Sequence, residues 1–125
     1  MKNIIATGNA PGAIGPYSQA VKKGNILITS GQLPIDMATG AFPEGIEDQT
    51  RASLTNCRSI LEAAGASMAD VIKTTVFLSD MNNFGAMNGV YKTFFEGDFP
   101  ARSAVEVARL PKDALVEIEC IAVVD

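Results

Sequence analysis

Arg102 is the residue of this chain that is best suited to bind a small acid. It follows Pro100 and Ala101 and opens a β-branched and apolar segment, residues 102–108, that favours a strand. Proline disfavours helix in its neighbourhood, so Arg102 is expected where a loop enters that strand. A guanidinium can hold a carboxylate with two parallel hydrogen bonds, although a weak surface salt bridge is the ordinary alternative. In a chain without histidine, arginine and glutamate are the best candidates for chemistry, which indicates an enzyme that acts on small acids.

Two carboxylates, Glu117 and Glu119, lie inside the last predicted strand. They alternate with apolar residues, so both side chains are on the face that also carries Ile121 and Val123. A buried carboxylate must be paired, hydrogen-bonded or neutral. One interpretation is therefore a salt bridge in an interface, and the other is a general base or water-positioning group in a cleft between subunits. The spacing does not choose between the two glutamates.

Four further residues offer groups that a ligand could use. Tyr17 leaves a glycine- and proline-containing loop with its phenol, and Ser30 contributes a hydroxyl next to Gly31, whose bare backbone lets a ligand approach its N–H. Asn88 lies on the apolar stripe of a predicted helix. Three of the four also have a structural explanation: Tyr17 as a packing aromatic, Gly31 as a bend in a strand, and Asn88 as an amide that bonds to the backbone.

The elements that must position these residues follow from the periodicity of the chain. Gly24 and Asn25 separate two apolar runs and predict a hairpin that leads into a buried strand. Residues 46–64 repeat apolar or small side chains at intervals of three and four, which predicts an amphipathic helix that ends before Gly65. The order β-β-α-β-α-β-β predicts an α+β fold with both helices on one face of the sheet. The remaining predicted elements are a strand at 71–78, a helix at 83–95, and strands at 102–108 and 114–124.

The last predicted strand is apolar on both of its faces, although helices are expected on only one. The second face needs a partner, and since most oligomers are symmetric, we expect a homo-oligomer that buries it between subunits. If the last two strands form a hairpin, Glu106 lies opposite Glu117, and Arg102 is on the order of 13 Å further along at about 3.4 Å per residue. A site that uses both Arg102 and Glu117 would then be completed by another subunit or strand.

Composition limits the class of protein. The 125 residues suit a single domain, residues 1–125, and 47% apolar with 19% charged residues is a globular balance. A net charge of -4 with scattered lysines and arginines makes nucleic acid an unlikely partner. Cys57 and Cys120 lie in apolar surroundings and are expected as structural thiols. No stretch has the pattern of a signal peptide or a membrane span, so we expect a cytoplasmic protein.

Several stretches of the chain together resemble the reactive intermediate deaminase family (RidA, YjgF) of enamine and imine deaminases. The resemblance spans nearly the whole chain, and its most specific part is the segment around Arg102. The matching stretches are AIGPYSQA at 13–20, SGQLP at 30–34, TTVFL at 74–78, PARS at 100–103 and EVARLP at 106–111.

The resemblance implies a chorismate-mutase-like fold and a homotrimer whose sheets enclose a central barrel, with ligand clefts between subunits. It also implies that Arg102 binds the substrate carboxylate and that Glu117, rather than Glu119, acts on the attacking water. The matches to cleft-lining positions are Tyr17, Ser30, Gly31 and Asn88. Ala104 stands where relatives often have cysteine or threonine. Because that thiol or hydroxyl is missing, the resemblance does not fix the polarity of the pocket or the range of substrates.

The activity implied is hydrolysis of short 2-enamino or 2-imino acids, such as 2-aminoacrylate, 2-iminopropanoate and 2-iminobutanoate, to 2-keto acids and ammonia. The resemblance implies that no cofactor and no metal take part, and that the substrates come from pyridoxal-phosphate dehydratases. Two alternatives come with the same family: a ligand-binding or chaperone-like role without turnover, and a ribonuclease or translation inhibitor. The absence of histidine and the acidic net charge weigh against the ribonuclease.

Overall fold

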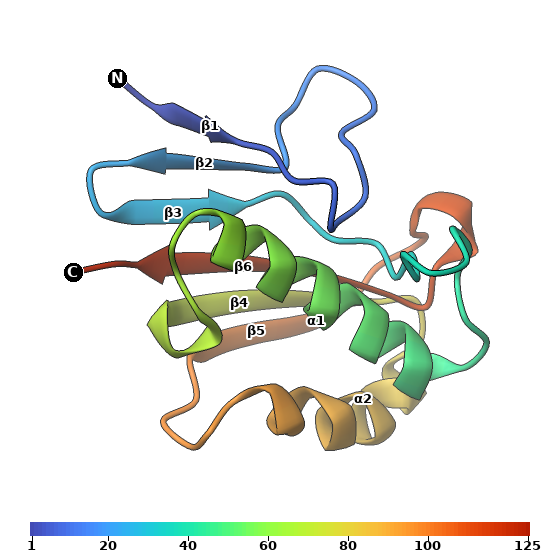
Figure 1. Ribbon diagram of the computed structural model, residues 1–125. Helices are drawn as coiled ribbons and strands as arrows, with labels where there is room; N and C mark the ends of the chain where they lie inside the picture. The colour runs from blue at the N-terminus through green and yellow to red at the C-terminus, as the bar shows by residue number, and fades with distance from the viewer.

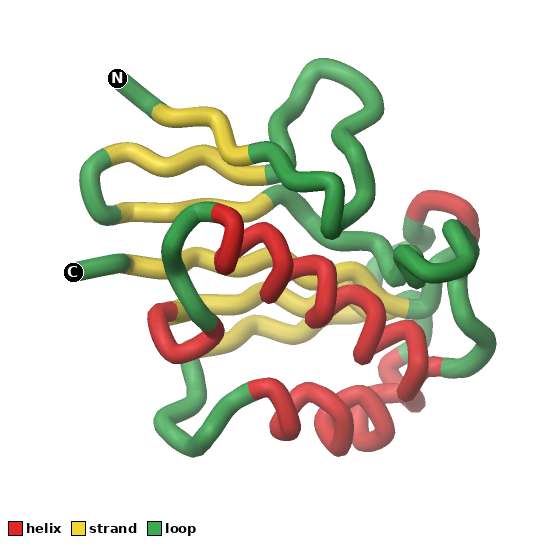
Figure 2. Tube along the Cα trace, in the orientation of Figure 1, coloured by secondary structure: helices red, strands yellow, loops and turns green.

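The computed structural model describes residues 1–125 as one six-stranded mixed sheet with two helices packed on one of its faces (Figure 1). The order of the strands across the sheet is β1-β2-β3-β6-β4-β5. Figure 2 shows both helices on the same side of the strands, as the sequence predicts. None of the helices combines the length and the apolar character that crossing a membrane requires. The elements are β1 (Asn3–Ile5), β2 (Ala20–Lys23), β3 (Ile26–Thr29), α1 (Ile46–Ala63), β4 (Val71–Leu78), α2 (Phe84–Tyr91), β5 (Ala101–Glu106) and β6 (Val116–Val123).

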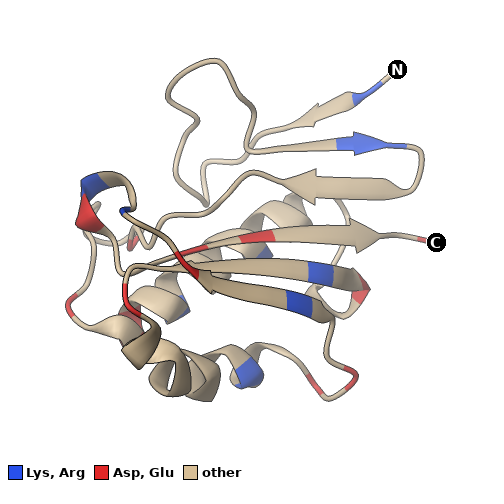
Figure 3. Cartoon of the chain, turned by 180° about the vertical axis from the view of Figure 1, so that it is seen from behind, with Lys and Arg blue, Asp and Glu red and all other residues tan.

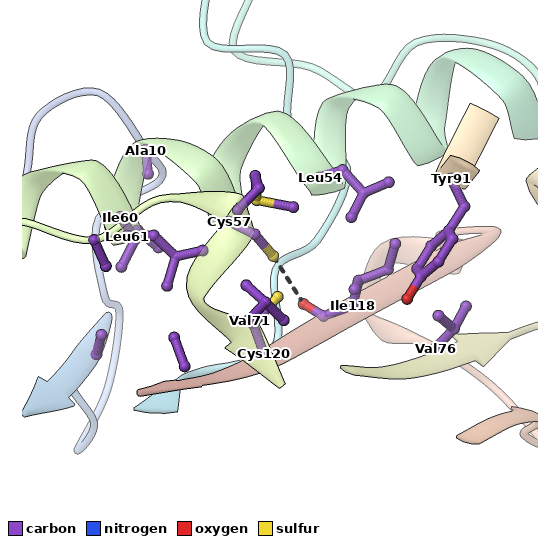
Figure 4. Close-up of a cluster of buried hydrophobic side chains, with 14 of the residues drawn as sticks. Ala10, Leu54, Cys57, Ile60, Leu61, Val71, Val76, Tyr91, Ile118 and Cys120 are labelled. Carbon is purple, nitrogen blue, oxygen red and sulfur yellow. Dashed lines mark hydrogen bonds between the residues drawn. The ribbon is translucent and has the colours of Figure 1, made fainter. Parts of the chain in front are cut away.

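Helix α1 forms where the sequence predicts it and ends as predicted. Gly65 follows with a φ of 82°, a left-handed conformation that glycine adopts without steric cost. The buried stripe of α1 packs on the sheet around Leu54, Ile60 and Leu61, each fully buried (Figure 4). Cys57 lies in the same layer and its Sγ is 3.5 Å from the carbonyl oxygen of Ile118. A hydrogen bond with Cys120, together with burial, raises the pKa of the Cys57 thiol well above its usual value, so it packs as a neutral side chain.

Helix α2 is shorter than predicted, because the regular α-helix ends at Tyr91 and a single 3-10 turn, Lys92–Phe94, continues it. Asp80 precedes this region and caps a 3-10 turn, Met81–Asn83: its side chain accepts a hydrogen bond from the Asn82 N–H at 2.9 Å. The short β1 strand is an addition to the predicted elements. It pairs with β2 at the edge of the sheet and is too short to leave a periodic signal in the sequence.

The predicted hairpin of the last two strands is wrong. Strand β5 pairs in parallel with β4, while β6 lies between β3 and β4 and is antiparallel to both. The path β4, α2, β5 is a strand-helix-strand crossover, which places its two strands parallel. The two-sided apolar character of β6 suits a central position, whereas β5 has exposed residues and occupies the edge. Glu106 therefore does not lie opposite Glu117: it pairs with Leu78, and Glu117 pairs with Phe77.

The face of the sheet opposite the helices is uncovered, as predicted. In Figure 3, which views the molecule from behind, the strands lie in front and the helices are beyond them. We call this surface the open face; Glu117, Glu119, Ile121 and Val123 belong to it, and they alternate along β6 with residues that are fully or almost fully buried under the helices. The open face also carries Ile26, Ile28 and Val105, whose exposed fractions are 49%, 45% and 45%. These apolar side chains would be protected from water only by another molecule.

Candidate functional site

Arg102 lies in a pocket between the edge strand β5 and helix α2. Its NH1 group donates a hydrogen bond to Asn88 Oδ1 at 2.6 Å. The guanidinium carbon is 4.8 Å from the centre of the Tyr91 ring and 5.3 Å from that of Phe84. A cavity of about 500 Å³ opens here, and we call it the arginine pocket; it is lined by Asn88, Tyr91, Lys92, Phe99, Pro100 and Arg102.

The arginine pocket holds a cation that no acidic side chain neutralises. The ion pairs of the structure are Asp48 with Arg51 and Arg109 with Asp113, all four on the surface. Arg102 is instead held by an amide oxygen and two aromatic faces. Its remaining N–H groups are therefore available to an external carboxylate, the anion that a planar guanidinium binds best.

Glu117 lies on the open face, directly beside Gly31. The backbone there approaches the carboxyl group so closely that a Cβ at position 31 would be 2.9 Å from Glu117 Cδ. Gly31 is held in place by its neighbours, because the Ser30 N–H bonds to the Gln19 carbonyl and Gln32 forms a two-bond bridge with Ile118. Only glycine leaves room for the carboxylate at this point.

Partial burial and a nearby like charge act together on Glu117. Burial, followed by repulsion from Glu119 on the same face, raises the pKa of Glu117 from its ordinary value. A glutamate with a raised pKa is a better proton acceptor at neutral pH than an ordinary surface glutamate. Of the two glutamates that the sequence left as alternatives, Glu117 is the one that lies against Gly31.

Tyr17 and Ser30 line a second cavity, of about 530 Å³, over strands β2 and β3. The cavity includes Ile28, an open-face residue, so it lies on the same side of the sheet as Glu117. The Ser30 hydroxyl donates to the Ser18 carbonyl, and the Tyr17 hydroxyl accepts a 3.3 Å hydrogen bond from the Ile14 N–H. Ser30 precedes Gly31, so the chain leads directly from this cavity to the Glu117 carboxyl group. We refer to Tyr17, Ser30, Gly31 and Glu117 together as the glutamate half-site.

The arginine pocket and the glutamate half-site are on opposite faces of the sheet. Arg102 pairs with Thr74, which is fully buried under α2, while Glu117 pairs with Phe77. Thr74 and Phe77 are three residues apart on β4, and side chains alternate between faces. The structure therefore brings Arg102 together with Asn88 and Glu117 together with Gly31, but one chain cannot present Arg102 and Glu117 to the same small ligand.

Three residues in or next to the arginine pocket were not identified from the sequence as functional candidates: Tyr91, which lines it, Phe84, which contacts Arg102, and Thr74, which contacts Tyr91. Phe84 and Tyr91 have the spacing of a helix face that also includes Asn88, so the apolar stripe of the helix contained them. Their contact with Arg102 follows from the parallel pairing of β4 and β5, which the hairpin prediction missed. No group of three His, Cys, Asp or Glu side chains is arranged to hold a metal ion.

Comparison with known proteins places this geometry in a family. The family model described as Endoribonuclease L-PSP matches residues 7–124. The chain is 60% identical over 123 residues to a RutC family protein of Pyrococcus horikoshii, covering 98% of each chain. It is 55% identical over 126 residues to the 2-iminobutanoate/2-iminopropanoate deaminase of Salmonella typhimurium, again covering 98% of both.

A solved relative has nearly the same fold. The crystal structure of Escherichia coli TdcF with bound serine superposes with a TM-score of 0.95 at 52% identity, and covers 98% of this chain and 99% of that one. The fold described above is therefore shared along nearly the whole chain.

Proposed function

The chain belongs to the endoribonuclease L-PSP family, which includes the reactive intermediate deaminases, and from this premise we propose that it hydrolyses short 2-imino and 2-enamino acids. The products are the 2-keto acid and ammonia, and the substrates include 2-aminoacrylate, 2-iminopropanoate and 2-iminobutanoate. Relatives at 54 to 55% identity over nearly the whole chain carry the name 2-iminobutanoate/2-iminopropanoate deaminase. The whole chain, residues 1–125, acts as a single deaminase domain.

The observation that carries the proposal is the unneutralised Arg102 guanidinium in a small pocket. Every proposed substrate has a carboxylate next to the carbon that reacts. A carboxylate held by two parallel hydrogen bonds fixes the position of that carbon, and so replaces a random encounter with water by an oriented one. The serine bound to TdcF is also a small carboxylate with nitrogen on the neighbouring carbon.

Glu117 supplies the proton transfer. Its carboxylate accepts a proton from a water molecule while the water oxygen forms a bond to the imine carbon, and the C=N electron pair moves to nitrogen. The protonated Glu117 then gives this proton to the nitrogen, which yields a carbinolamine with one hydroxyl and one amino group. The same carboxylate takes the hydroxyl proton and passes it to the nitrogen, so the C–N bond breaks and ammonia leaves while the O–H electron pair forms the carbonyl. Ser30 and the Gly31 N–H, which makes no backbone hydrogen bond, are placed to hold the substrate beside Glu117, and Tyr17 closes the cleft from the loop.

A second copy of the chain must complete the site, because Arg102 and Glu117 are on opposite faces of one sheet. The open face of one subunit packs against the β5 edge of the next, so the glutamate half-site of one meets the arginine pocket of its neighbour. Such a contact joins two different surfaces of the chain, so the subunits form a closed assembly only when they are arranged in a ring. We propose the homotrimer, with three clefts at its subunit interfaces. The two unpaired thiols support a reducing compartment, the cytoplasm.

The direct test is formation of keto acid from an imine generated in situ by a threonine dehydratase, compared with spontaneous hydrolysis. Wild type should accelerate the reaction, and Arg102→Ala and Glu117→Gln should each lose at least 100-fold in rate, as expected for groups that bind and activate the reactants. Arg109→Ala and Glu62→Gln change an exposed arginine and an exposed glutamate and serve as matched controls. No acceleration by wild type would refute the deaminase.

The ribonuclease alternative has the name of the family model in its favour. The acidic chain without histidine offers neither a phosphate-binding surface nor the usual neutral-pH acid and base. Cleavage of RNA that persists in Arg102→Ala, and that falls steeply with added salt, would support the ribonuclease in place of the deaminase.

A further inference from the structure

The side chain of Arg102 is oriented by helix α2 rather than by its own strand. Strand β5 is at the edge of the sheet and only one neighbour, β4, supports it. The guanidinium extends to a helix face formed by Phe84, Asn88 and Tyr91, which are spaced by four and three residues. Asn88 fixes one nitrogen of the guanidinium, and the two aromatic rings fix its plane.

Tyr91 is itself held by a hydrogen bond to Thr74. The two hydroxyl oxygens are 2.7 Å apart; Thr74 is fully buried and Tyr91 is 5% exposed. Figure 4 shows the Tyr91 ring reaching from α2 toward the strands with its hydroxyl at the sheet end. Thr74 is also the residue that pairs with Arg102 across β4 and β5. Tyr91 therefore contacts both members of one cross-strand pair: its hydroxyl meets Thr74, and its ring faces the Arg102 guanidinium.

We propose that Tyr91, locked by Thr74, is a positioning residue that aims the Arg102 guanidinium at the substrate carboxylate. A bidentate contact requires both guanidinium nitrogens to be placed within about half an ångström, and an unrestrained arginine side chain has several rotatable bonds. The buried hydroxyl pair removes the freedom of the ring to rotate and tilt. The ring, in turn, offers its electron-rich face to the cation and holds it in plane.

This proposal rests on the proposed function, since it assigns a role within that same site. It makes a specific prediction about kinetics. Without the hydroxyl pair the guanidinium can still reach its productive position, but it occupies that position for a smaller fraction of the time. Binding of the substrate and of the transition state therefore weakens equally, so KM rises while kcat stays within about twofold. One neutral hydrogen bond predicts a rise in KM of roughly three- to tenfold.

The test uses substitutions that remove one hydroxyl while keeping the shape of the side chain. Tyr91→Phe and Thr74→Val should raise KM equally, and the double variant should be no worse than either, because both break the same bond. Thr74→Ser keeps the hydroxyl and should restore the KM of wild type. Thr50→Val is the matched control: Thr50 is equally buried, but its hydroxyl has no partner, so KM should not change.

Binding of pyruvate, measured by titration calorimetry on the same variants, separates this proposal from the deaminase itself. Pyruvate affinity that depends on Arg102 and weakens in Tyr91→Phe supports the positioning role even if wild type shows no turnover. Unchanged KM and unchanged pyruvate affinity in Tyr91→Phe and Thr74→Val would overturn it while the deaminase stands. A loss of kcat at constant KM, or a Thr74→Ser variant that behaves like Thr74→Val, would also overturn it. Melting curves confirm that each variant is folded.

Discussion

Substitution of Gly31 by alanine is the sharpest test of how the glutamate half-site is built. The added Cβ would lie 2.9 Å from Glu117 Cδ and 3.2 Å from Cγ. Optimal carbon–carbon separations are about 3.5 to 4.0 Å, so the carboxyl group must retreat by about 1 Å. Near Glu117, strand β6 is fixed by β4 on one side and by the Gln32–Ile118 bridge on the other, so the Glu117 side chain rather than the backbone will move.

The cost of that movement falls on catalysis. A misplacement of about 1 Å costs on the order of 100-fold in rate, or about 2.7 kcal/mol of activation free energy. The folded state loses little, because the side chain that yields is flexible, and alanine restricts the unfolded chain by about 0.4 to 1 kcal/mol relative to glycine. We expect kcat/KM to fall about 100-fold while the free energy of unfolding changes by less than about 1 kcal/mol.

The assay is the initial rate of keto-acid formation, measured together with urea unfolding. Gly8→Ala is the matched control, since a Cβ there would meet nothing within 4 Å, and its rate should equal that of wild type. In a Glu117→Gln background, Gly31→Ala should cause no further loss, because the carboxylate it displaces is already absent. A Gly31→Ala variant that keeps wild-type activity, or one that is equally impaired with and without the Glu117 carboxylate, would show the reasoning to be wrong.

Three further predictions concern pH, the core and assembly. Because the pKa of Glu117 is raised from its ordinary 4.5, kcat/KM should rise with pH through a value above 4.5, and Glu119→Gln should move this limb in the pH–rate profile to lower pH. Between the pKa of Glu117 in the unfolded chain and its raised pKa in the folded protein, the folded protein binds more protons. The free energy of unfolding therefore falls as pH rises through this window. Urea unfolding of Glu117→Gln, measured across the same pH range, should lack that fall. Leu54→Ala empties a fully buried position and should cost about 2 to 5 kcal/mol in urea unfolding; a smaller loss would mean that the layer between α1 and the sheet collapses to fill the space. Val105→Lys places a charge on the open face beside the β5 edge and should shift the sedimentation coefficient to that of a monomer and abolish activity together, whereas an unchanged assembly would exclude the proposed interface.

Much of the fold could be predicted because its strongest signals are local. Helix α1 repeats apolar residues at helical spacing and ends before Gly65, and the alternation along β6 is sufficient to assign Glu117 to the open face. The element order also predicts correctly that both helices lie on one face of the sheet and leave the other uncovered. Each of these inferences depends on residues within single elements or on the order of the elements along the chain.

The arrangement between elements could not be predicted in the same way. Strands β5 and β6 are neighbours in sequence but not in the sheet, and the signals within each strand do not say which partner it pairs with. That single error conceals the contact of Arg102 with Tyr91, which exists because β5 lies parallel to β4 and under α2. The closeness of Gly31 to Glu117 is likewise a contact across 86 residues, and no local pattern reports it.

The central position of the last strand governs how this chain can fold. Before β6 is in place, β1-β2-β3 and β4-β5 are two separate fragments, each with an unpaired edge. The final strand inserts between them and joins residues that are far apart in sequence, which makes folding slow relative to a helical protein of this size. During synthesis, the sheet stays open until β6 has been made, and the open intermediate is prone to aggregate. A truncation of a few residues within β6 would therefore remove the strand that joins β3 to β4, and not merely shorten a strand at the edge of the sheet.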